Sequence, residues 1–201
     1  MTFPNQLSVL RIILSPVFYF MFLSDNPIVR RLSIVVFIIA VLTDWYDGWH
    51  ARKYKSVSKF GIFIDPLADK ILTSFSFVLF YTLDIIPLWM VIVIILRDLL
   101  ITIMRSFDEL KGFTLETSYL AKIKTFIQMT YILFVLILLS ILTFNIDDVT
   151  KDNISKFLSH SNTINYFLMA LITFLTLYTG ITYFFQKKSP KIEINKEEKN
   201  N

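Results

Sequence analysis

Six apolar runs divide this sequence, and they constrain its fold more than any other feature. They fall at about residues 7–24, 32–47, 67–84, 86–104, 125–144 and 163–185. A helix that crosses a bilayer needs roughly 17–25 predominantly apolar residues. With 55% hydrophobic and 16% aromatic residues, the chain of 201 residues is too apolar for a soluble domain. The pattern predicts an all-α integral membrane protein with six transmembrane helices, formed by a single domain over residues 1–186.

The distribution of lysine and arginine predicts the orientation of this domain. Fourteen of the 20 basic residues lie in the loops after the second and fourth runs and in the tail, against four in the alternate loops. Because cytoplasmic loops are enriched in Lys and Arg, both termini are predicted to be cytoplasmic, in a bacterial inner or plasma membrane. Arg30 and Arg31 count against this orientation. The net charge of +4 then reflects topology and not nucleic-acid binding. The charged tail, residues 187–201, is predicted to be disordered.

Two segments depart from the simple pattern of spans. The first, Asn5-x-Leu7-Ser8-x2-Arg11-x4-Pro16, combines an early arginine with a proline inside an apolar run. It predicts an N-terminal amphipathic surface helix that bends at Pro16 into the membrane, with Arg11 as either a headgroup anchor or a site residue. The second, residues 145–162, contains three aspartates and few basic residues, and it is interpreted as an external loop.

The segment between Asp44 and Asp69 carries the strongest functional signal. It places four aspartates between two apolar runs, where one Asp at the centre of a membrane helix costs roughly 2.5–3.5 kcal/mol. If the second run continues as a helix, Asp44 and Asp47 share one face with Gly48 and Ala51. Asp65 and Asp69 are one helical turn apart at the start of the third run. The helix ends that meet here are predicted to lie at the cytoplasmic side, with two carboxylates on each.

These carboxylates favour a metal site. Four acids close together resist ionising unless cations lie between them, and two divalent ions would balance their charge. Oxygen ligands suit Mg²⁺ or Mn²⁺, while the absence of cysteine and the presence of only two histidines argue against zinc or copper. An alternative stays open, since Asp65 before Pro66 also fits a helix N-cap, and Asp44 or Asp47 could merely end a span.

The whole pattern resembles the signature of the CDP-alcohol phosphatidyltransferase family, integral membrane enzymes that join a CDP-activated lipid or alcohol to a hydroxyl acceptor. It runs Asp44-x2-Asp47-Gly48-x2-Ala51-Arg52-x8-Gly61-x3-Asp65-x3-Asp69. The resemblance implies that the four aspartates hold two divalent cations and that Asp69 is also the general base. It implies donor binding by a further set: Gly48 and Ala51 beside the nucleotide, Arg52 facing its phosphates, and Gly61. Ser58 is a weaker candidate for a phosphate contact, and a plain loop serine is the alternative.

Four basic residues near the ends of the fourth and fifth runs predict an anion pocket: Arg97, Arg105, Lys122 and Lys124. Snorkelling to the membrane interface is the alternative for the last three. Arg97 needs a partner, and Asp98 is not expected to be it, because adjacent helix residues point about 100° apart. Within the family, this set resembles the members whose acceptor is glycerol 3-phosphate. Members that use phosphatidylglycerol tend to lack the second lysine.

The predicted function is therefore a Mg²⁺-dependent transfer of the phosphatidyl group of CDP-diacylglycerol to glycerol 3-phosphate, which gives phosphatidylglycerophosphate and CMP in phospholipid biosynthesis. Phosphatidylglycerol and inositol phosphate remain alternative acceptors. A small cation channel or transporter with an acidic metal site is the alternative of another class. The expected partners are these substrates and membrane lipids, without nucleic acid. A homodimer is left open, although the chain has no GxxxG motif.

Overall fold

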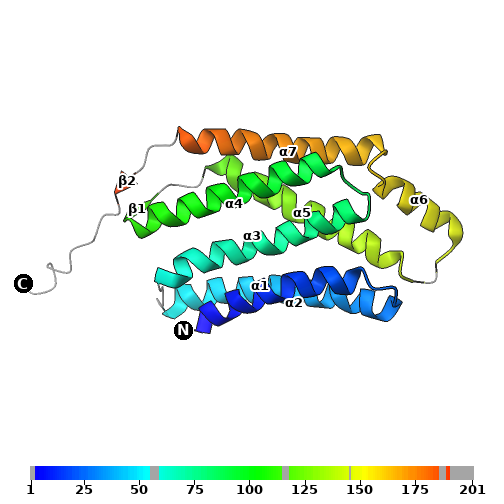
Figure 1. The fold of residues 1–201 in the computed structure, drawn as a ribbon, viewed down its shortest axis with the longest axis horizontal. Helices are drawn as coiled ribbons and strands as arrows, with labels where there is room; N and C mark the ends of the chain where they lie inside the picture. The colour runs from blue at the N-terminus through cyan, green and yellow to red at the C-terminus, as the bar shows by residue number, and fades with distance from the viewer. Residues whose placement is uncertain (1–2, 55–58, 115–117, 145, 186–188, 191–201) are drawn as a thin grey trace, which may run out of the picture.

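The protein is a bundle of long helices (Figure 1). The computed structural model describes residues 3–54, 59–114, 118–144, 146–185 and 189–190. Within these ranges some side chains fall outside the description, namely those of residues 3–4, 44–45, 47–54, 59–60, 62, 114 and 189–190.

Six long helices correspond to the six apolar runs, so the predicted helical architecture is confirmed. They are α1 (Phe3–Phe22), α2 (Pro27–Tyr54), α3 (Lys59–Thr82), α4 (Leu88–Leu110), α5 (Tyr119–Ile141) and α7 (Thr163–Phe184). Helices α2 and α3 extend beyond their apolar runs into the charged segment between them, as expected. Two strands of two residues each, β1 (Phe113–Thr114) and β2 (Ser189–Pro190), pair antiparallel beside the end of α4.

The helices pack in an order that leaves the start of α1 and the end of α7 at the same end of the bundle. Helix α1 lies against α2 and α3, α3 against α4, and α7 against α4 and α5. As Figure 1 shows, the start of α1, the junction of α2 with α3, and the end of α7 all lie at the left end of the bundle. The opposite end carries α6 (Asp148–Leu158) and the short connection between α3 and α4.

Helix α1 corrects the prediction of an amphipathic helix on the membrane surface. Residues 3–22 form one helix that continues through Pro16. Its buried face carries polar side chains in its first half and phenylalanines in its second, at Asn5, Ser8, Arg11, Ser15, Phe18 and Phe22. Its exposed face is apolar, with Leu10, Ile13, Val17 and Phe20. The polar face of this amphipathic helix therefore points inward, against α3, and not toward a membrane surface.

The segment predicted to be an external loop contains helix α6. The carboxylate of Asp147 caps this helix by accepting a hydrogen bond from the backbone N–H of Thr150 at 2.8 Å. That bond holds the pKa of Asp147 below its ordinary value. The capping aspartate and the acidic first turn favour a helix start, so the acids that suggested a loop belong to a helix N-terminus instead.

An aromatic core fills the middle of the bundle and separates its two polar ends. The ring of Phe18 contacts that of Phe37 at 5.1 Å between centroids, and Phe80 meets Tyr131 edge-on at 6.1 Å. Among the residues that the structure describes, three helical stretches are long and apolar enough to cross a membrane: residues 5–22 in α1, 119–141 in α5, and 148–184, which contains α6 and α7. Apart from the two short strands, the described structure is thus helical, with segments suited to a membrane.

Candidate active site

The acidic segment lies where two helices meet. Helix α2 continues to Tyr54 and α3 begins at Lys59, so Asp44 and Asp47 belong to one helix and Asp65 and Asp69 to the next. Only four residues separate these helices, which keeps the end of one close to the start of the other. The predicted helical register of both aspartate pairs is confirmed by these bounds. Because α3 begins six residues before Asp65, and Pro66 lies inside it, the alternative of a helix N-cap at Asp65 is wrong.

Much of the predicted metal and donor site falls outside the described side-chain environments. This holds for two predicted metal ligands, Asp44 and Asp47, and for the donor-site positions Gly48, Ala51 and Arg52, while Ser58 lies outside the described residues altogether. Gly61 is described, and it is buried in the first turn of α3. Among the described residues, no group of three or more acidic, histidine or cysteine side chains is placed to hold a metal.

Asp65 and Asp69 differ in their surroundings. Asp65 accepts a hydrogen bond from the hydroxyl of Ser8, so the N-terminal helix holds one carboxylate of the acidic segment. The buried guanidinium of Arg11 lies on the same face of α1 as Ser8, three residues further on. Asp69 has a side chain 31% exposed and faces the ammonium of Lys70 at 3.4 Å. Asp65 is therefore anchored by α1, whereas Asp69 remains accessible.

A cavity of about 320 Å³ opens beside Asp69. Its walls come from α3, α4, α5 and α7, and its polar lining includes Asp69, Lys70, Arg97, Thr102, Arg105, Glu109, Thr125, Thr179 and Tyr183. Three of these side chains are basic and two are acidic. The cavity thus combines a carboxylate of the acidic segment with two arginines from a helix further along the chain. Such a lining can hold an anionic molecule next to a proton acceptor.

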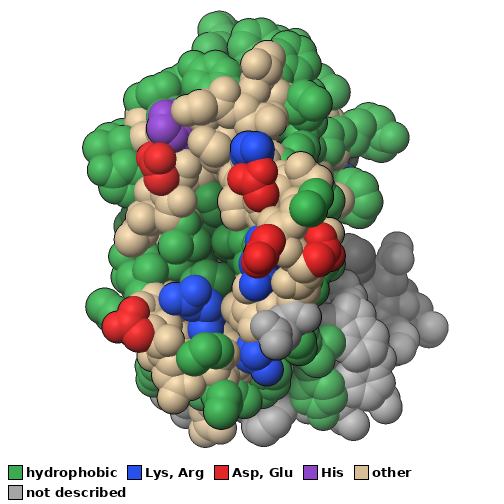
Figure 2. Space-filling view, turned by 90° about the vertical axis from the view of Figure 1, so that its right-hand side faces the viewer, with side chains coloured by type: hydrophobic (Ala, Val, Ile, Leu, Met, Phe, Trp, Pro, Cys, Tyr) green, Lys and Arg blue, Asp and Glu red, His purple; other side chains and the backbone are tan. Residues whose placement is uncertain are grey.

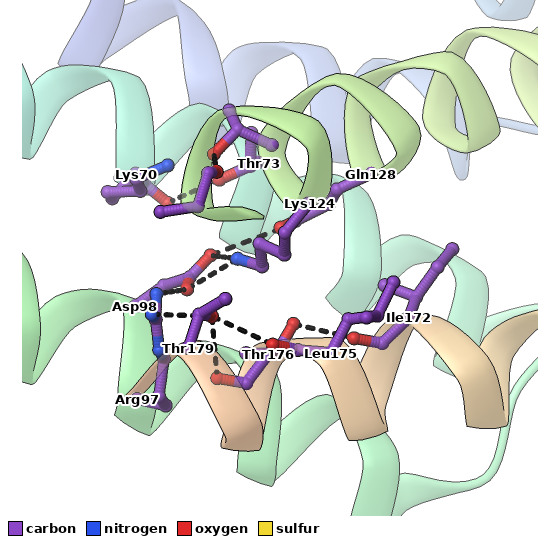
Figure 3. Close-up of polar contacts among 12 residues, drawn as sticks. Lys70, Thr73, Arg97, Asp98, Lys124, Gln128, Ile172, Leu175, Thr176 and Thr179 are labelled. Carbon is purple, nitrogen blue, oxygen red and sulfur yellow. Dashed lines mark hydrogen bonds and ion pairs between the residues drawn. The ribbon is translucent and has the colours of Figure 1, made fainter. Parts of the chain in front are cut away.

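A buried ionic cluster centred on Asp98 adjoins the cavity through Arg97 (Figure 3). The ammonium of Lys124 contacts both carboxylate oxygens of Asp98, at 2.6 and 2.7 Å. The amide of Gln128 donates to the same carboxylate at 3.3 Å, and Nη1 of Arg97 donates to it at 2.9 Å. The side chains of Asp98 and Lys124 are only 3% and 2% exposed. The cluster therefore ties α4 to α5 inside the bundle.

This cluster corrects the expectation that Asp98 is not the partner of Arg97. Helix geometry sets only the direction in which each side chain leaves the backbone. Arginine is long enough to curve back, and its guanidinium reaches the neighbouring carboxylate. Its other terminal nitrogen, Nη2, donates to the hydroxyl of Thr179 on α7 at 2.8 Å.

The four predicted acceptor-binding residues do not come together as one group. Arg97 and Arg105 line the cavity with Asp69. Lys124 is buried against Asp98, and Lys122 is exposed; neither is among the residues that line the cavity. A direct contact of these two lysines with the acceptor's phosphate stays a prediction.

Several polar side chains that line this cavity are not predicted from the sequence, among them Lys70, Thr179 and Tyr183. For Lys70, the position directly after Asp69 in the acidic segment is a usable signal. Thr179 and Tyr183 lie in the last apolar run, where nothing in the sequence marks them as different from other polar residues in a span.

Comparison with known proteins shows which family and which relatives this chain resembles. The family model of CDP-alcohol phosphatidyltransferase matches residues 1–184. A Bacillus subtilis protein named CDP-diacylglycerol–glycerol-3-phosphate 3-phosphatidyltransferase is 38% identical over 137 residues, 62% of this chain and 71% of its own. A Rickettsia typhi protein of that name is 32% identical over 181 residues, 90% of this chain and 94% of its own. One from Rickettsia bellii is 33% identical over 184 residues, with 90% and 92% covered.

Proposed function

The chain belongs to the CDP-alcohol phosphatidyltransferase family, and from this premise we propose that it transfers the phosphatidyl group of CDP-diacylglycerol to glycerol 3-phosphate. The products are phosphatidylglycerophosphate and CMP. The names of the relatives support the choice of both substrates. The observation that carries the proposal is the cavity in which Asp69 lies together with Arg97 and Arg105.

This lining suits the two ends of glycerol 3-phosphate. The acceptor must present a hydroxyl to a base and a phosphate to cations, and the cavity offers a carboxylate and two guanidinium groups. Arginine binds phosphate well because its planar donors match the phosphate oxygens. A volume of about 320 Å³ is at the small end of ligand pockets, which suits a small polar acceptor.

The reaction needs a proton acceptor and an activated phosphate. Asp69 accepts the proton of the acceptor's hydroxyl, and the oxygen attacks the phosphorus that carries diacylglycerol. A new P–O bond forms as the bond between the two phosphates breaks, and CMP leaves with the bonding electrons. Arg97 and Arg105 hold the acceptor's own phosphate, which orients the hydroxyl towards the donor. Gly48, Ala51, Arg52, Ser58 and Gly61 are proposed to contact the donor.

Divalent cations are part of this proposal. Asp44, Asp47, Asp65 and Asp69 would hold two Mg²⁺ or Mn²⁺ ions. The described carboxylates fit such ions in kind, because Asp65 and Asp69 are oxygen ligands one helical turn apart and Asp69 is accessible. When bound, the ions would neutralise the donor's diphosphate and stabilise the charge on the departing CMP.

We place this site at the cytoplasmic side of a membrane, with six helices crossing it and both termini in the cytoplasm. The exposed apolar side chains on the flanks of α1 and α7, such as Phe20 and Phe174, support contact with lipid. Figure 2 views the end of the bundle away from the cavity, where acidic, basic and histidine side chains gather on the surface. A bundle with apolar flanks and charged ends is typical of a membrane-spanning domain.

An acceptor panel tests the proposed function. Purified protein in detergent would receive CDP-diacylglycerol and Mg²⁺ with glycerol 3-phosphate, inositol phosphate, serine or phosphatidylglycerol, and CMP release would be measured. We expect CMP only when the donor and glycerol 3-phosphate are both present. Release with phosphatidylglycerol instead would assign the chain to another reaction of the family. No release with any acceptor, together with cation flux in liposomes, would favour a channel or transporter.

A further inference from the structure

Arg97 is held from two sides at the wall of the cavity. Its Nη1 donates to Asp98 at 2.9 Å, and its Nη2 donates to Thr179 of α7 at 2.8 Å (Figure 3). A guanidinium bound at both terminal nitrogens has little rotational freedom left. Its position at the cavity wall therefore depends on the two groups that accept from it.

The first of these groups, Asp98, is itself fixed. Lys124 and Gln128 of α5 bind its carboxylate from the side opposite α7 (Figure 3). One negative charge thus meets the positive charges of Lys124 and Arg97, which leaves the cluster with one excess positive charge. Because Lys124 is buried and Arg97 lines the cavity, that excess is available to an anion only through Arg97.

The second group, Thr179, has its hydroxyl proton committed elsewhere. The hydroxyl donates to the carbonyl of Leu175 in its own helix at 2.8 Å, so it faces Arg97 as an acceptor. The next residue, Gly180, leaves the space that the arginine occupies. A Cβ atom at Gly180 would lie 3.0 Å from both Cγ and Nε of Arg97. Any larger residue there would push against a side chain that is pinned at its far end.

We propose that Thr179 and Gly180 are positioning residues for Arg97, and that α7 thereby forms part of the site for the acceptor's phosphate. Thr179 fixes the guanidinium through a hydrogen bond, and Gly180 allows its stem to pass close to the α7 backbone. This inference rests on the proposed function, since it concerns the phosphate of the same acceptor. It gives a role to the last helix of the chain, whose sequence carries no charged residue between Thr163 and Phe184.

Two small substitutions in the full-length protein test the inference. Thr179→Val removes the acceptor while keeping the shape of the side chain, and Gly180→Ala adds the single carbon that would contact Arg97. Each should raise KM for glycerol 3-phosphate about three- to tenfold, since one hydrogen bond or its geometry is lost, and should leave KM for CDP-diacylglycerol unchanged. The inhibition constant of inorganic phosphate against glycerol 3-phosphate should rise by a similar factor.

Matched controls separate positioning from helix packing. Thr173 is also a buried threonine of α7, and its hydroxyl donates to the carbonyl of Met169 at 2.8 Å. Thr173→Val therefore repeats the same chemical change away from Arg97, and it should leave both KM values near those of the wild type. Thr179→Ser keeps a hydroxyl and should recover most of the affinity that Thr179→Val loses.

The outcomes are distinct. Equal KM changes in Thr179→Val and Thr173→Val would overturn the inference, as would a fall in kcat or in folded protein with both KM values unchanged. If Thr179→Val does not fold, Gly180→Ala alone decides, by the same KM values and the phosphate inhibition constant. If the wild type releases no CMP with glycerol 3-phosphate, the proposed function fails, and the inference fails with it. If the wild type is active and neither variant changes KM, only the inference fails.

Discussion

Both ends of the helical bundle carry ion pairs, yet the pairs differ in burial and in what they can do. At the cavity end, the pair between Lys124 and Asp98 is 2% and 3% exposed and joins two helices. At the α6 end, the pair between Lys156 and Asp152 is 71% and 57% exposed and lies one turn apart on one helix. A buried charge without its partner is costly, whereas an exposed pair contributes little.

Asp69 is intermediate between Asp98 and Asp152 in the exposure of its carboxylate. Its side chain is 31% exposed, and its neighbour Lys70 lies at 3.4 Å, so the carboxylate is neither locked by several partners nor free in bulk solvent. A carboxylate in this situation is accessible to a bound molecule. One substitution, aspartate to asparagine, therefore tests all three environments, because it removes the charge and keeps the shape.

The largest effect is expected for Asp69→Asn. Loss of a general base lowers the rate by roughly 10²- to 10⁴-fold, and the loss of a metal ligand adds to this. Steady-state CMP release with both substrates measures the effect, and the thermal unfolding midpoint in detergent serves as the control. Turnover within a few-fold of the wild type would show that Asp69 is not the base.

The next effect, on stability, is expected for Asp98→Asn. The change leaves Lys124 and Arg97 in the bundle without their buried counter-charge, and breaking a buried pair by removing one partner costs about 3–5 kcal/mol. We expect a lower unfolding midpoint and a smaller yield of folded protein. In the double variant Asp98→Asn with Lys124→Gln, part of the loss should be recovered. A single variant as stable as the wild type would contradict the structural role of the cluster.

The sequence predicts the helices well because apolar length is a strong and local signal. It also predicts that α2 and α3 continue through the charged segment, since spacings such as that of Asp65 and Asp69 fit a helical turn. The sequence does not predict helix α6, because its 11 residues contain no apolar run. Its markers were weaker, namely the capping Asp147 and a lysine, Lys156, in the last turn.

The residues of the candidate site likewise fall into those that the sequence predicts and those that it does not. The aspartates could be found from the sequence because acids are rare in apolar runs, and Arg97 and Arg105 stood out for the same reason. The contact between Arg97 and Asp98 could not be predicted from the sequence, because the reach of a long side chain is not set by the direction of its Cα–Cβ bond. The roles of Thr179 and Gly180 could not be predicted either, since the contacts of a small uncharged residue in a span depend on the helix that packs against it.

A smaller, kinetic effect is expected for Arg105→Gln. Arg105 is exposed and lines the cavity, so its loss should not disturb the fold. It should raise KM for glycerol 3-phosphate about tenfold, the low end for a charge-assisted hydrogen bond, because solvent screens an exposed cation. Lys111→Gln is the matched control, since Lys111 is exposed just beyond α4 and is not among the residues that line the cavity. An equal change in both variants would indicate general electrostatic attraction instead of a phosphate contact.

The smallest effect is expected at the other end of the bundle, for Asp152→Asn. The pair with Lys156 is exposed and local to α6, and such pairs contribute about 0–1 kcal/mol. Loss of the pair should move the unfolding midpoint only slightly and leave kcat and both KM values unchanged. The measurement is the one used for Asp98→Asn, made at low and at high salt, because screening should remove the small difference from the wild type. A large loss of stability, or a change in KM for glycerol 3-phosphate, would mean that the α6 end is coupled to the cavity through the aromatic core, and that burial alone does not separate the two ends.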